Sequence, residues 1–165
     1  MRDRPVISIE NYTINCDDAD EKKVGGCAIV VRNYYNILVE ELGSTSSRCT
    51  FVRLRDCRGC KLWIVSPHAP TETTEDNSKN TFYNELKALM STTPRKQVVI
   101  VGIDANEKMG IEQQSGVLGK WHYSGGGTSD KDNRLVDLCE HLIVAYYRES
   151  STPSAYVVNI NPFEG

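Results

Sequence analysis

The chain has 165 residues, of which 39% are hydrophobic and 25% are charged, so it is long enough for one globular domain with a buried core. No apolar run approaches the ~20 residues that span a bilayer, and the N-terminal residues contain no apolar secretory segment. We therefore expect an intracellular protein of the nucleus or cytoplasm that does not associate with membranes. The net charge of −3 excludes the overall basic field that is usual for nucleic-acid binders.

The six cysteines do not indicate a disulfide framework, because the sequence gives no secretory context. Cys57 and Cys60 have the CxxC spacing of zinc and redox sites, but no second pair or nearby histidine completes a zinc site. The pair also falls in a predicted hairpin turn, whereas a thioredoxin-like motif opens a helix. A metal or redox role is therefore the less favoured interpretation of this motif.

Short apolar runs in the first half of the chain predict a series of strands. Residues 5–16 predict one or two short strands, and residues 27–31 and 37–41 predict one strand each. The charged residues 17–23 and the polar residues 43–47 are expected to form loops.

Residues 49–56 and 61–66 are two extended runs, and the short connection between them contains a glycine, which predicts a β-hairpin. In the second run Leu62 and Ile64 face one side while Trp63 and Val65 face the other, which indicates burial on both faces.

Five basic residues crowd this hairpin, with Asp56 as the only acid among them: Arg48, Arg53, Arg55, Arg58 and Lys61. A solvated sheet face is the common explanation of such a group. The alternative is a phosphate-binding patch, for which Arg53, Arg55 and Arg58 are the candidate substrate-binding residues.

Residues 76–91 predict a helix, because Phe82, Leu86, Leu89 and Met90 recur at helical spacing. Either Asp76 or Asn77 is expected to cap its N-terminus. The helix leads into the apolar run 98–103, so a strand–helix–strand unit is expected.

A second helix is expected after Asp130 or Asp132, where Leu135, Leu138, Cys139 and Leu142 keep helical spacing. No periodic pattern continues after Arg148. We therefore expect one domain over residues 1–147 and a poorly ordered tail over residues 148–165.

The run 98–103 fits a strand buried on both faces, and it ends abruptly at Asp104, Ala105 and Asn106. Because a buried carboxylate is costly unless paired or solvated, Asp104 is expected where the strand leaves the core. Asp104 and Asn106 point the same way while the chain stays extended, and such a pair can polarise water and hold a phosphate oxygen or a metal ion. The alternative is an Asx turn in which both side chains bond their own backbone.

His68 lies between two prolines that keep residues 66–71 extended, so it is expected at the end of a central strand. There it can donate to a phosphate or act as an acid or base. The alternative is a histidine satisfied by a neighbouring carbonyl.

Five segments between residues 23 and 141 resemble, in family order, the endonuclease/exonuclease/phosphatase family. The similarity is greatest to the apurinic-type endonuclease domains of non-LTR retrotransposons and to the craniofacial-development-protein-2-like proteins derived from them. The segments are KVGGCAIVVRN from Lys23, KLWIVSPHAPT ending at Thr71, NTFYNELKALM, VVIVGIDANEKMG, and RLVDLC from Arg134.

The resemblance implies an α/β (α+β) fold, a partial form of the family's four-layer α/β/β/α sandwich, and a phosphodiesterase that acts on DNA. It implies that Asp104 orients or deprotonates the attacking water and that Asn106 positions the phosphate. The family more often has a tyrosine at the position of His68, but histidine also donates a hydrogen bond. Members of the family use Mg²⁺ or Mn²⁺.

The chain departs from the family in two ways that bear on activity. It lacks the strand whose glutamate binds the metal, and it lacks the Ser-Asp-His segment near the family's C-terminus. The resemblance therefore implies a truncated copy that is weakly active or inactive, with doubtful metal binding and an unidentified metal ligand set. The alternatives are a non-enzymatic remnant or nucleic-acid-binding module and, ranked lower, a phosphatase for small phosphates. No obligate protein partner is evident, and exposed sheet edges with marginal stability are expected.

Overall fold

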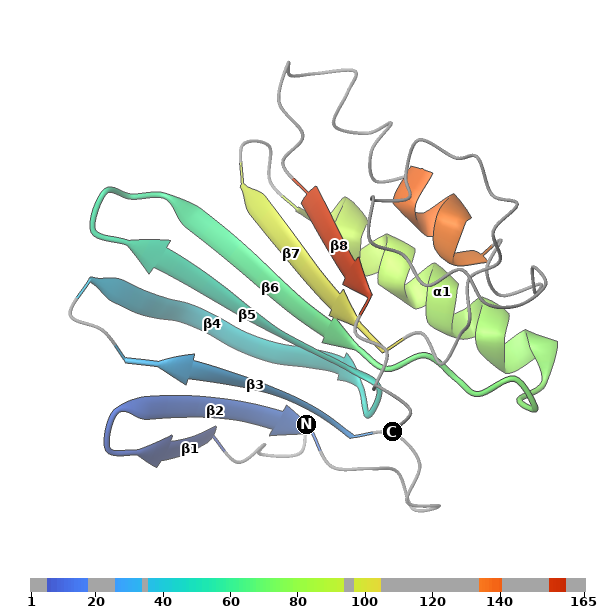
Figure 1. Ribbon diagram of the computed structural model, residues 1–165, viewed down its shortest axis with the longest axis horizontal. Helices are drawn as coiled ribbons and strands as arrows, with labels where there is room; N and C mark the ends of the chain where they lie inside the picture. The colour runs from blue at the N-terminus through green and yellow to red at the C-terminus, as the bar shows by residue number, and fades with distance from the viewer. Residues whose placement is uncertain are drawn as a thin grey trace.

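The computed structural model describes residues 6–17, 26–33, 36–93, 97–104, 134–140 and 155–159. Strands and one long helix follow one another along these ranges (Figure 1). They are β1 (Val6–Ile9), β2 (Tyr12–Asp17), β3 (Cys27–Arg32), β4 (Ile37–Ser46), β5 (Cys49–Asp56), β6 (Lys61–Pro67), α1 (Asp76–Ser91), β7 (Val98–Ile103) and β8 (Ala155–Asn159). Residues 134–140 are also helical. No helix within these ranges is long and apolar enough to cross a membrane.

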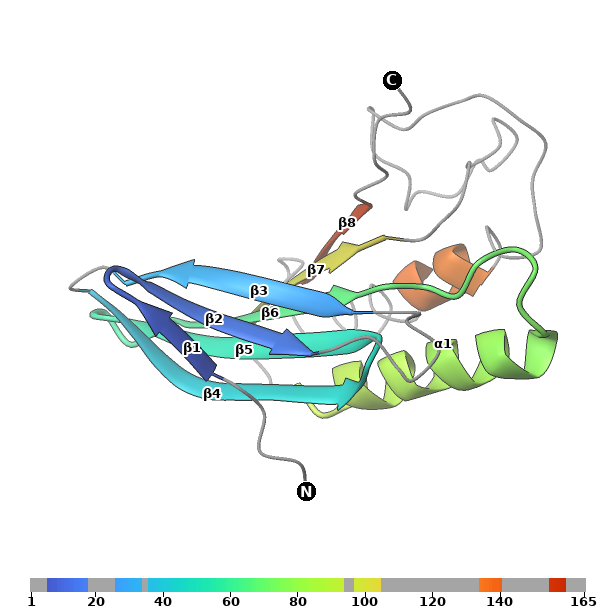
Figure 2. The same ribbon diagram turned by 90° about the horizontal axis from the view of Figure 1, so that it is seen from below.

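The strands form two sheets. β1, β2 and β3 make an antiparallel sheet in that order, and β4, β5, β6, β7 and β8 make a second sheet in that order. The smaller sheet packs on the larger through β2 and β3, which contact β5 (Figure 2). The predicted mixed α/β fold with two packed sheets is therefore confirmed.

The helix α1 has the bounds that its apolar spacing predicted. Phe82, Leu86 and Met90 are buried in one cluster with Trp63 and Val101 from the larger sheet. Because β6 and β7 pair in parallel, the chain must cross from the end of one strand to the start of the next, and α1 makes this crossing. The predicted strand–helix–strand unit is confirmed, and it brings the carboxyl ends of β6 and β7 together.

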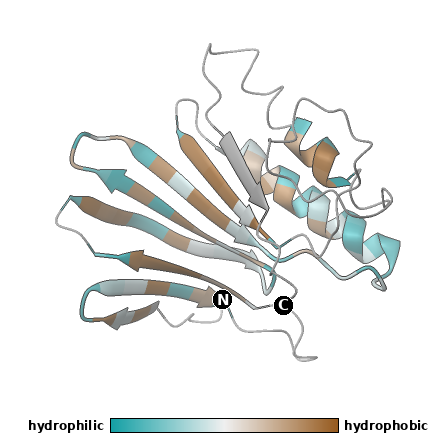
Figure 3. Cartoon of the chain, in the orientation of Figure 1, coloured by the Kyte–Doolittle hydropathy of each residue, from teal (hydrophilic) through white to brown (hydrophobic). Residues whose placement is uncertain are grey.

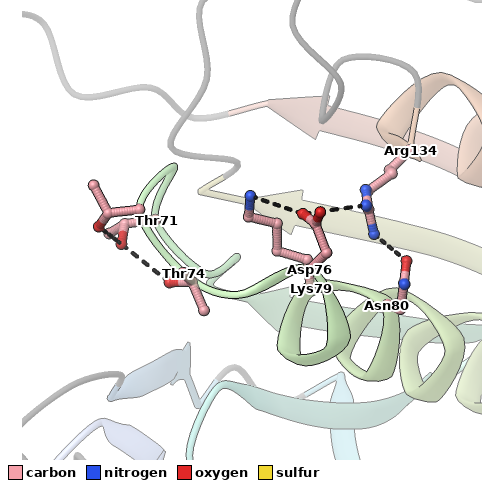
Figure 4. Close-up of polar contacts among 7 residues, drawn as sticks. Thr71, Thr74, Asp76, Lys79, Asn80 and Arg134 are labelled. Atoms are coloured by element: carbon pink, nitrogen blue, oxygen red, sulfur yellow. Dashed lines mark hydrogen bonds and ion pairs between the residues drawn. The ribbon is translucent and has the colours of Figure 1, made fainter.

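The N-terminus of α1 differs from the prediction. The N-cap residue is Glu75, and no side chain makes a capping hydrogen bond. Asp76 instead lies in the first turn, where its carboxylate pairs with Lys79 Nζ at 3.3 Å and with Arg134 Nη2 at 3.7 Å. Arg134 also donates a hydrogen bond to Asn80 (Figure 4). The carboxylate thus joins α1 to the second helical segment, and that tertiary contact replaces a local cap.

The second predicted helix is confirmed over residues 134–140, where Leu135, Leu138 and Cys139 join the same core cluster as α1. Leu142 lies outside the described residues.

The space between the two sheets holds a second apolar cluster. Ile29 and Val31 of β3 pack against Val52 and Leu54 of β5. Leu62 and Ile64 of β6 border this cluster, whereas Trp63 and Val65 lie in the cluster under α1, so the predicted burial of β6 on both faces is confirmed.

Two polar side chains, Asn15 and Thr50, are buried together among the apolar side chains. Asn15 is 3% exposed, and its Nδ2 donates to Thr50 Oγ1 at 2.6 Å and to the carbonyls of Gly43 and Phe51, each at 3.1 Å. These bonds satisfy a buried amide and fix β2 over β4 and β5.

The expected loop over residues 43–47 is wrong, because β4 continues to Ser46. Gly43 pairs with Phe51, and a Cβ at Gly43 would collide with the Phe51 ring, so the glycine makes room for an aromatic side chain. Ser44 adds a hydrogen bond to Asp17 of β2. Pairing with β5 therefore overrides the local preference of this polar segment for a loop.

The strand β7 is covered less evenly than expected. Val99, Val101 and Ile103 are fully buried, but Val98 is 42% exposed on the other face. Figure 3 shows hydrophobic residues along β7 and along β3. The prediction of burial on both faces is thus wrong at the start of the strand and right only for the face under α1.

Part of the expected C-terminal tail is a strand. Ala155–Asn159 form β8, which pairs in parallel with β7. The boundary of the domain at residue 147 stays a prediction, because the other residues after 147 lie outside the described ranges.

Candidate functional site at the ends of β6 and β7

The parallel pairing of β6 and β7 continues one step past both strands, at His68 and Asp104. Asp104 N donates to the Pro67 carbonyl at 3.1 Å, and Ala69 N donates to the Asp104 carbonyl at 2.8 Å. Both residues are half-buried. Asp104 therefore lies where the strand leaves the core, and the main chain holds it next to His68.

A third residue, Arg48, joins these two from the turn between β4 and β5. His68 N donates to the Arg48 carbonyl at 2.8 Å, and Arg48 Nη1 approaches the His68 carbonyl at 3.4 Å. The side chain is half-buried, so its guanidinium lies at the same edge of the larger sheet as His68. Arg48, His68 and Asp104 are therefore joined through main-chain groups where the two central strands end.

A cavity of about 440 Å³ lies at this edge. The start of β3, the end of β6 and the end of β7 line it, with these residues: Gly26, Cys27, Ala28, Ser66, Pro67, His68, Gly102 and Asp104. Gly26 has a φ of 89° and its N–H donates to the Ser47 carbonyl, so the chain turns tightly into β3 here. Several of the lining residues, such as Gly26, Ala28 and Gly102, have small side chains or none, so their main-chain groups can contact a ligand.

Cys27 forms an apolar part of the cavity wall. Burial, together with the nearby Cys49 and the carboxylate of Asp17, raises the pKa of its thiol to about 11, although Arg48 acts in the opposite direction. The thiol is thus protonated at neutral pH and is a poor nucleophile. The same interactions place Asp17 and Arg48 within electrostatic range of the cavity.

The predicted site residues fall into three groups. Asp104 and His68 are brought together, as the sequence predicted for strand ends. Asn106 lies outside the described residues. Arg53 and Arg55 pair with Trp63 and Lys61 of β6, and Arg58 follows in the hairpin turn, so all three lie roughly 16 Å or more along the hairpin from His68.

Two of those arginines have acidic partners on β4. Arg53 Nη1 is 2.9 Å from Glu41, and Arg55 Nε is 2.5 Å from Glu40. Arg53 also lies over the Trp63 ring, 4.7 Å from its centroid. These contacts fit the common explanation of a solvated sheet face, and the substrate-binding role of the three arginines stays a prediction.

The metal that the resemblance implies does not fit the described residues by themselves. Mg²⁺ and Mn²⁺ take oxygen ligands, usually one or two carboxylates with water and substrate. Within the described ranges no three His, Cys, Asp or Glu side chains converge, and Asp104 is the one carboxylate that lines the cavity. No step of the chemistry below is therefore assigned to a metal.

The position of Arg48 beside His68 is not among the sequence predictions, although the strand register of the hairpin contains a signal for it. A hairpin turn fixes the register of both strands, and Arg55 pairs with Lys61 here. Counting seven residues outward from each brings Arg48 opposite His68. In the sequence Arg48 belongs to one group with the other basic residues of the hairpin, whereas the strand register separates it from them.

The fold and the site define a class of protein: an α/β domain of two packed sheets with a cavity at the carboxyl ends of parallel strands, where such folds place their ligands. No family model matches the chain. It is similar to craniofacial development protein 2 of Tragulus javanicus, with 26% identity over 141 residues, and to the same protein of Bos taurus, with 25% over 134. These matches cover 84% and 81% of this chain but 24% and 22% of the relatives, so the chain spans about a quarter of their length.

Proposed function

We propose that this chain is a DNA phosphodiester-binding domain of the endonuclease/exonuclease/phosphatase type, derived from a retroelement, with weak hydrolytic activity. The observation that carries the proposal is the bridge between His68 and Asp104, which places both residues on the wall of one cavity, with the Arg48 guanidinium at the His68 carbonyl. The similarity to craniofacial development protein 2 supports the proposal, because the resemblance of the sequence motifs points to the same group.

Arg48, Asp104 and His68 each have a separate proposed role at the phosphate. The Arg48 guanidinium binds a phosphate oxygen, since its planar donors match that geometry. The Asp104 carboxylate orients an attacking water and accepts its proton. His68 donates a hydrogen bond to the phosphate or to the leaving oxygen. Asn106 is proposed to position the same phosphate, as in the family.

Weak activity follows from the charge of the reaction. Hydrolysis of a phosphodiester develops negative charge that must be stabilised as it forms. The described residues supply one guanidinium and one imidazole for this purpose but not a set of metal ligands. We therefore expect binding to be easier to detect than cleavage.

Binding to a labelled duplex with one abasic site tests the proposal by fluorescence anisotropy across a salt series. Arg48→Ala removes a charge-assisted contact worth about 1.5–3 kcal/mol, so we expect affinity to fall roughly tenfold or more. The slope of log affinity against log salt should also fall by about 1. Arg55→Ala is the matched control at the other end of the hairpin, and it should leave both quantities unchanged.

Nicking of supercoiled DNA, with Mg²⁺ and with a chelator, tests the chemistry. Any cleavage should disappear in Asp104→Asn and fall in His68→Gln. If Arg55→Ala weakens binding while Arg48→Ala does not, the hairpin patch is the DNA site and this proposal is wrong. If no DNA binds at low salt, the chain is a non-enzymatic remnant.

A further inference from the structure

The loop between β5 and β6 carries two exposed thiols in a fixed main-chain frame. Asp56 N donates to the Cys60 carbonyl at 3.0 Å, and Gly59 N donates to the Asp56 carbonyl at 3.1 Å. Asp56 Oδ1 also accepts from Arg58 N at 2.9 Å and from Cys60 N at 2.7 Å. Gly59 has a φ of 81°, as the third residue of a three-residue hairpin loop requires.

The fold does not need the two thiols. Every hydrogen bond just named uses a main-chain group or the Asp56 carboxylate, so the loop keeps its shape without sulfur. Cysteine is among the residue types most often buried, and Cys27, Cys49 and Cys139 are buried here. Cys57 and Cys60 are exposed and share one turn. The two thiols are therefore accessible for a chemical role and contribute little to packing.

We propose that Cys57 and Cys60 form half of a zinc-type metal site that a second copy of this chain completes. Zinc in structural sites takes four ligands, and two thiolates at CxxC spacing are a common half of that set. Within the described ranges no third His, Cys, Asp or Glu side chain joins the pair, so these residues of one copy supply two of the four ligands that zinc needs. When the β5–β6 turns of two copies come together, their four cysteine sulfur atoms complete the tetrahedral site.

The position and charge of the loop suit this arrangement. Figure 1 shows the β5–β6 turn at the end of the sheet away from the carboxyl ends of β6 and β7, so a second copy can meet it without covering the cavity there. A Zn²⁺ ion held by four thiolates carries excess negative charge. Arg58 lies between the two cysteines of each copy, whereas Arg55 and Lys61 on either side of the loop pair with Glu40. The two Arg58 guanidinium groups offset the charge of the site.

A metal suits the loop better than a disulfide does. A disulfide needs an S–S bond of about 2.05 Å with a dihedral near 90°, whereas Zn–S bonds of about 2.3 Å let the two sulfur atoms stay apart. Both cysteines are free thiols in this loop, which leaves them able to bind a metal without forming an S–S bond.

Titration of the reduced, metal-free chain with Co²⁺ tests the proposal, because tetrahedral thiolate coordination gives visible absorption that Zn²⁺ then removes. We expect saturation at one Co²⁺ per two chains, with a doubling of the mass measured by light scattering. Cys57→Ser and Cys60→Ser should each abolish the doubling. Cys16→Ser is the matched control, because this half-buried thiol lies on β2, and it should change neither result.

Three outcomes overturn the proposal: no tetrahedral Co²⁺ spectrum, saturation at one ion per chain with the mass of a monomer, or binding that survives loss of both thiols. Formation of a disulfide between Cys57 and Cys60, with no metal uptake, would also overturn the proposal. None of these results bears on DNA binding at the other end of the sheet, so the two proposals fail separately.

Discussion

His68 and Asp104 lie 36 residues apart in the chain, yet they form a parallel bridge one residue beyond the ends of β6 and β7. Main-chain groups make this pairing, through the hydrogen bonds of Asp104 N and Ala69 N. The main chain therefore closes the sheet at this point, and both residues line the cavity there.

The first prediction separates the function of these residues from their contribution to stability. His68→Gln and Asp104→Asn keep size and hydrogen-bonding capacity, so each should change the free energy of unfolding by no more than about 0.5 kcal/mol. Urea unfolding followed by circular dichroism measures this quantity. A loss of several kcal/mol in either variant would mean that the pair is structural.

The second prediction concerns the buried amide between the sheets. Asn15→Ala removes the hydrogen bonds that Nδ2 donates to Thr50 Oγ1 and to the Gly43 and Phe51 carbonyls, so we expect a loss of about 1–3 kcal/mol in the free energy of unfolding. Thr50→Val and the double variant complete a cycle, and the two residues should couple by about 0.5–3 kcal/mol. Additive effects of the two substitutions would argue against the Asn15–Thr50 contact.

The third prediction tests the packing of α1 on the larger sheet. Leu86 is 2% exposed within the core, while Leu89 is partly buried at its edge. Leu86→Ala should lower the free energy of unfolding by about 2–5 kcal/mol, because it leaves a cavity that the neighbours cannot fill. Leu89→Ala is the matched control and should cost less. Equal losses in the two variants would contradict the packing described.

The fourth prediction is a loss of stability at alkaline pH. Burial raises the pKa of the Cys49 and Cys139 thiols from 9.0 to about 11. Between pH 9 and 11 the unfolded chain loses these protons and the folded chain keeps them, so stability is complete below pH 9 and falls as pH rises.

Urea unfolding at intervals between pH 8 and 10.5 measures this loss. In Cys139→Val the decline should be less steep, by up to about 1.4 kcal/mol per pH unit above pH 9. Cys57→Val removes an exposed thiol and should leave the slope of the wild type. Identical slopes in all three chains would show that the buried thiols do not titrate in this range.

The fifth prediction concerns the outer face of the smaller sheet. Strand register places Ile7, Ile9, Tyr12 and Val30 on this face, where they are 42%, 53%, 40% and 58% exposed. Exposed apolar strands promote association. Ile9→Thr with Val30→Thr keeps β-branched side chains, so solubility measured by precipitation with ammonium sulfate should rise while the urea midpoint changes little. Leu86→Thr, a buried substitution, should destabilise the chain and lower its solubility.

The sequence by itself determined the elements whose signals are local. Apolar spacing predicted α1 with its observed bounds, because a helix with one buried face repeats that face within a few residues. The glycine between two β-prone runs predicted the β5–β6 hairpin, and the abrupt change after Ile103 predicted that Asp104 leaves the core.

Only the tertiary structure decided which of these residues meet. It extended β4 through Gly43 because Phe51 covers that glycine, and it added β8 beside β7. It also placed Arg48 beside His68 while pairing Arg55 with Glu40, which divided one basic cluster of the sequence between two ends of a sheet. Strand pairing and charge pairing join residues far apart in the chain, and no local pattern encodes which partner each strand or charge will find.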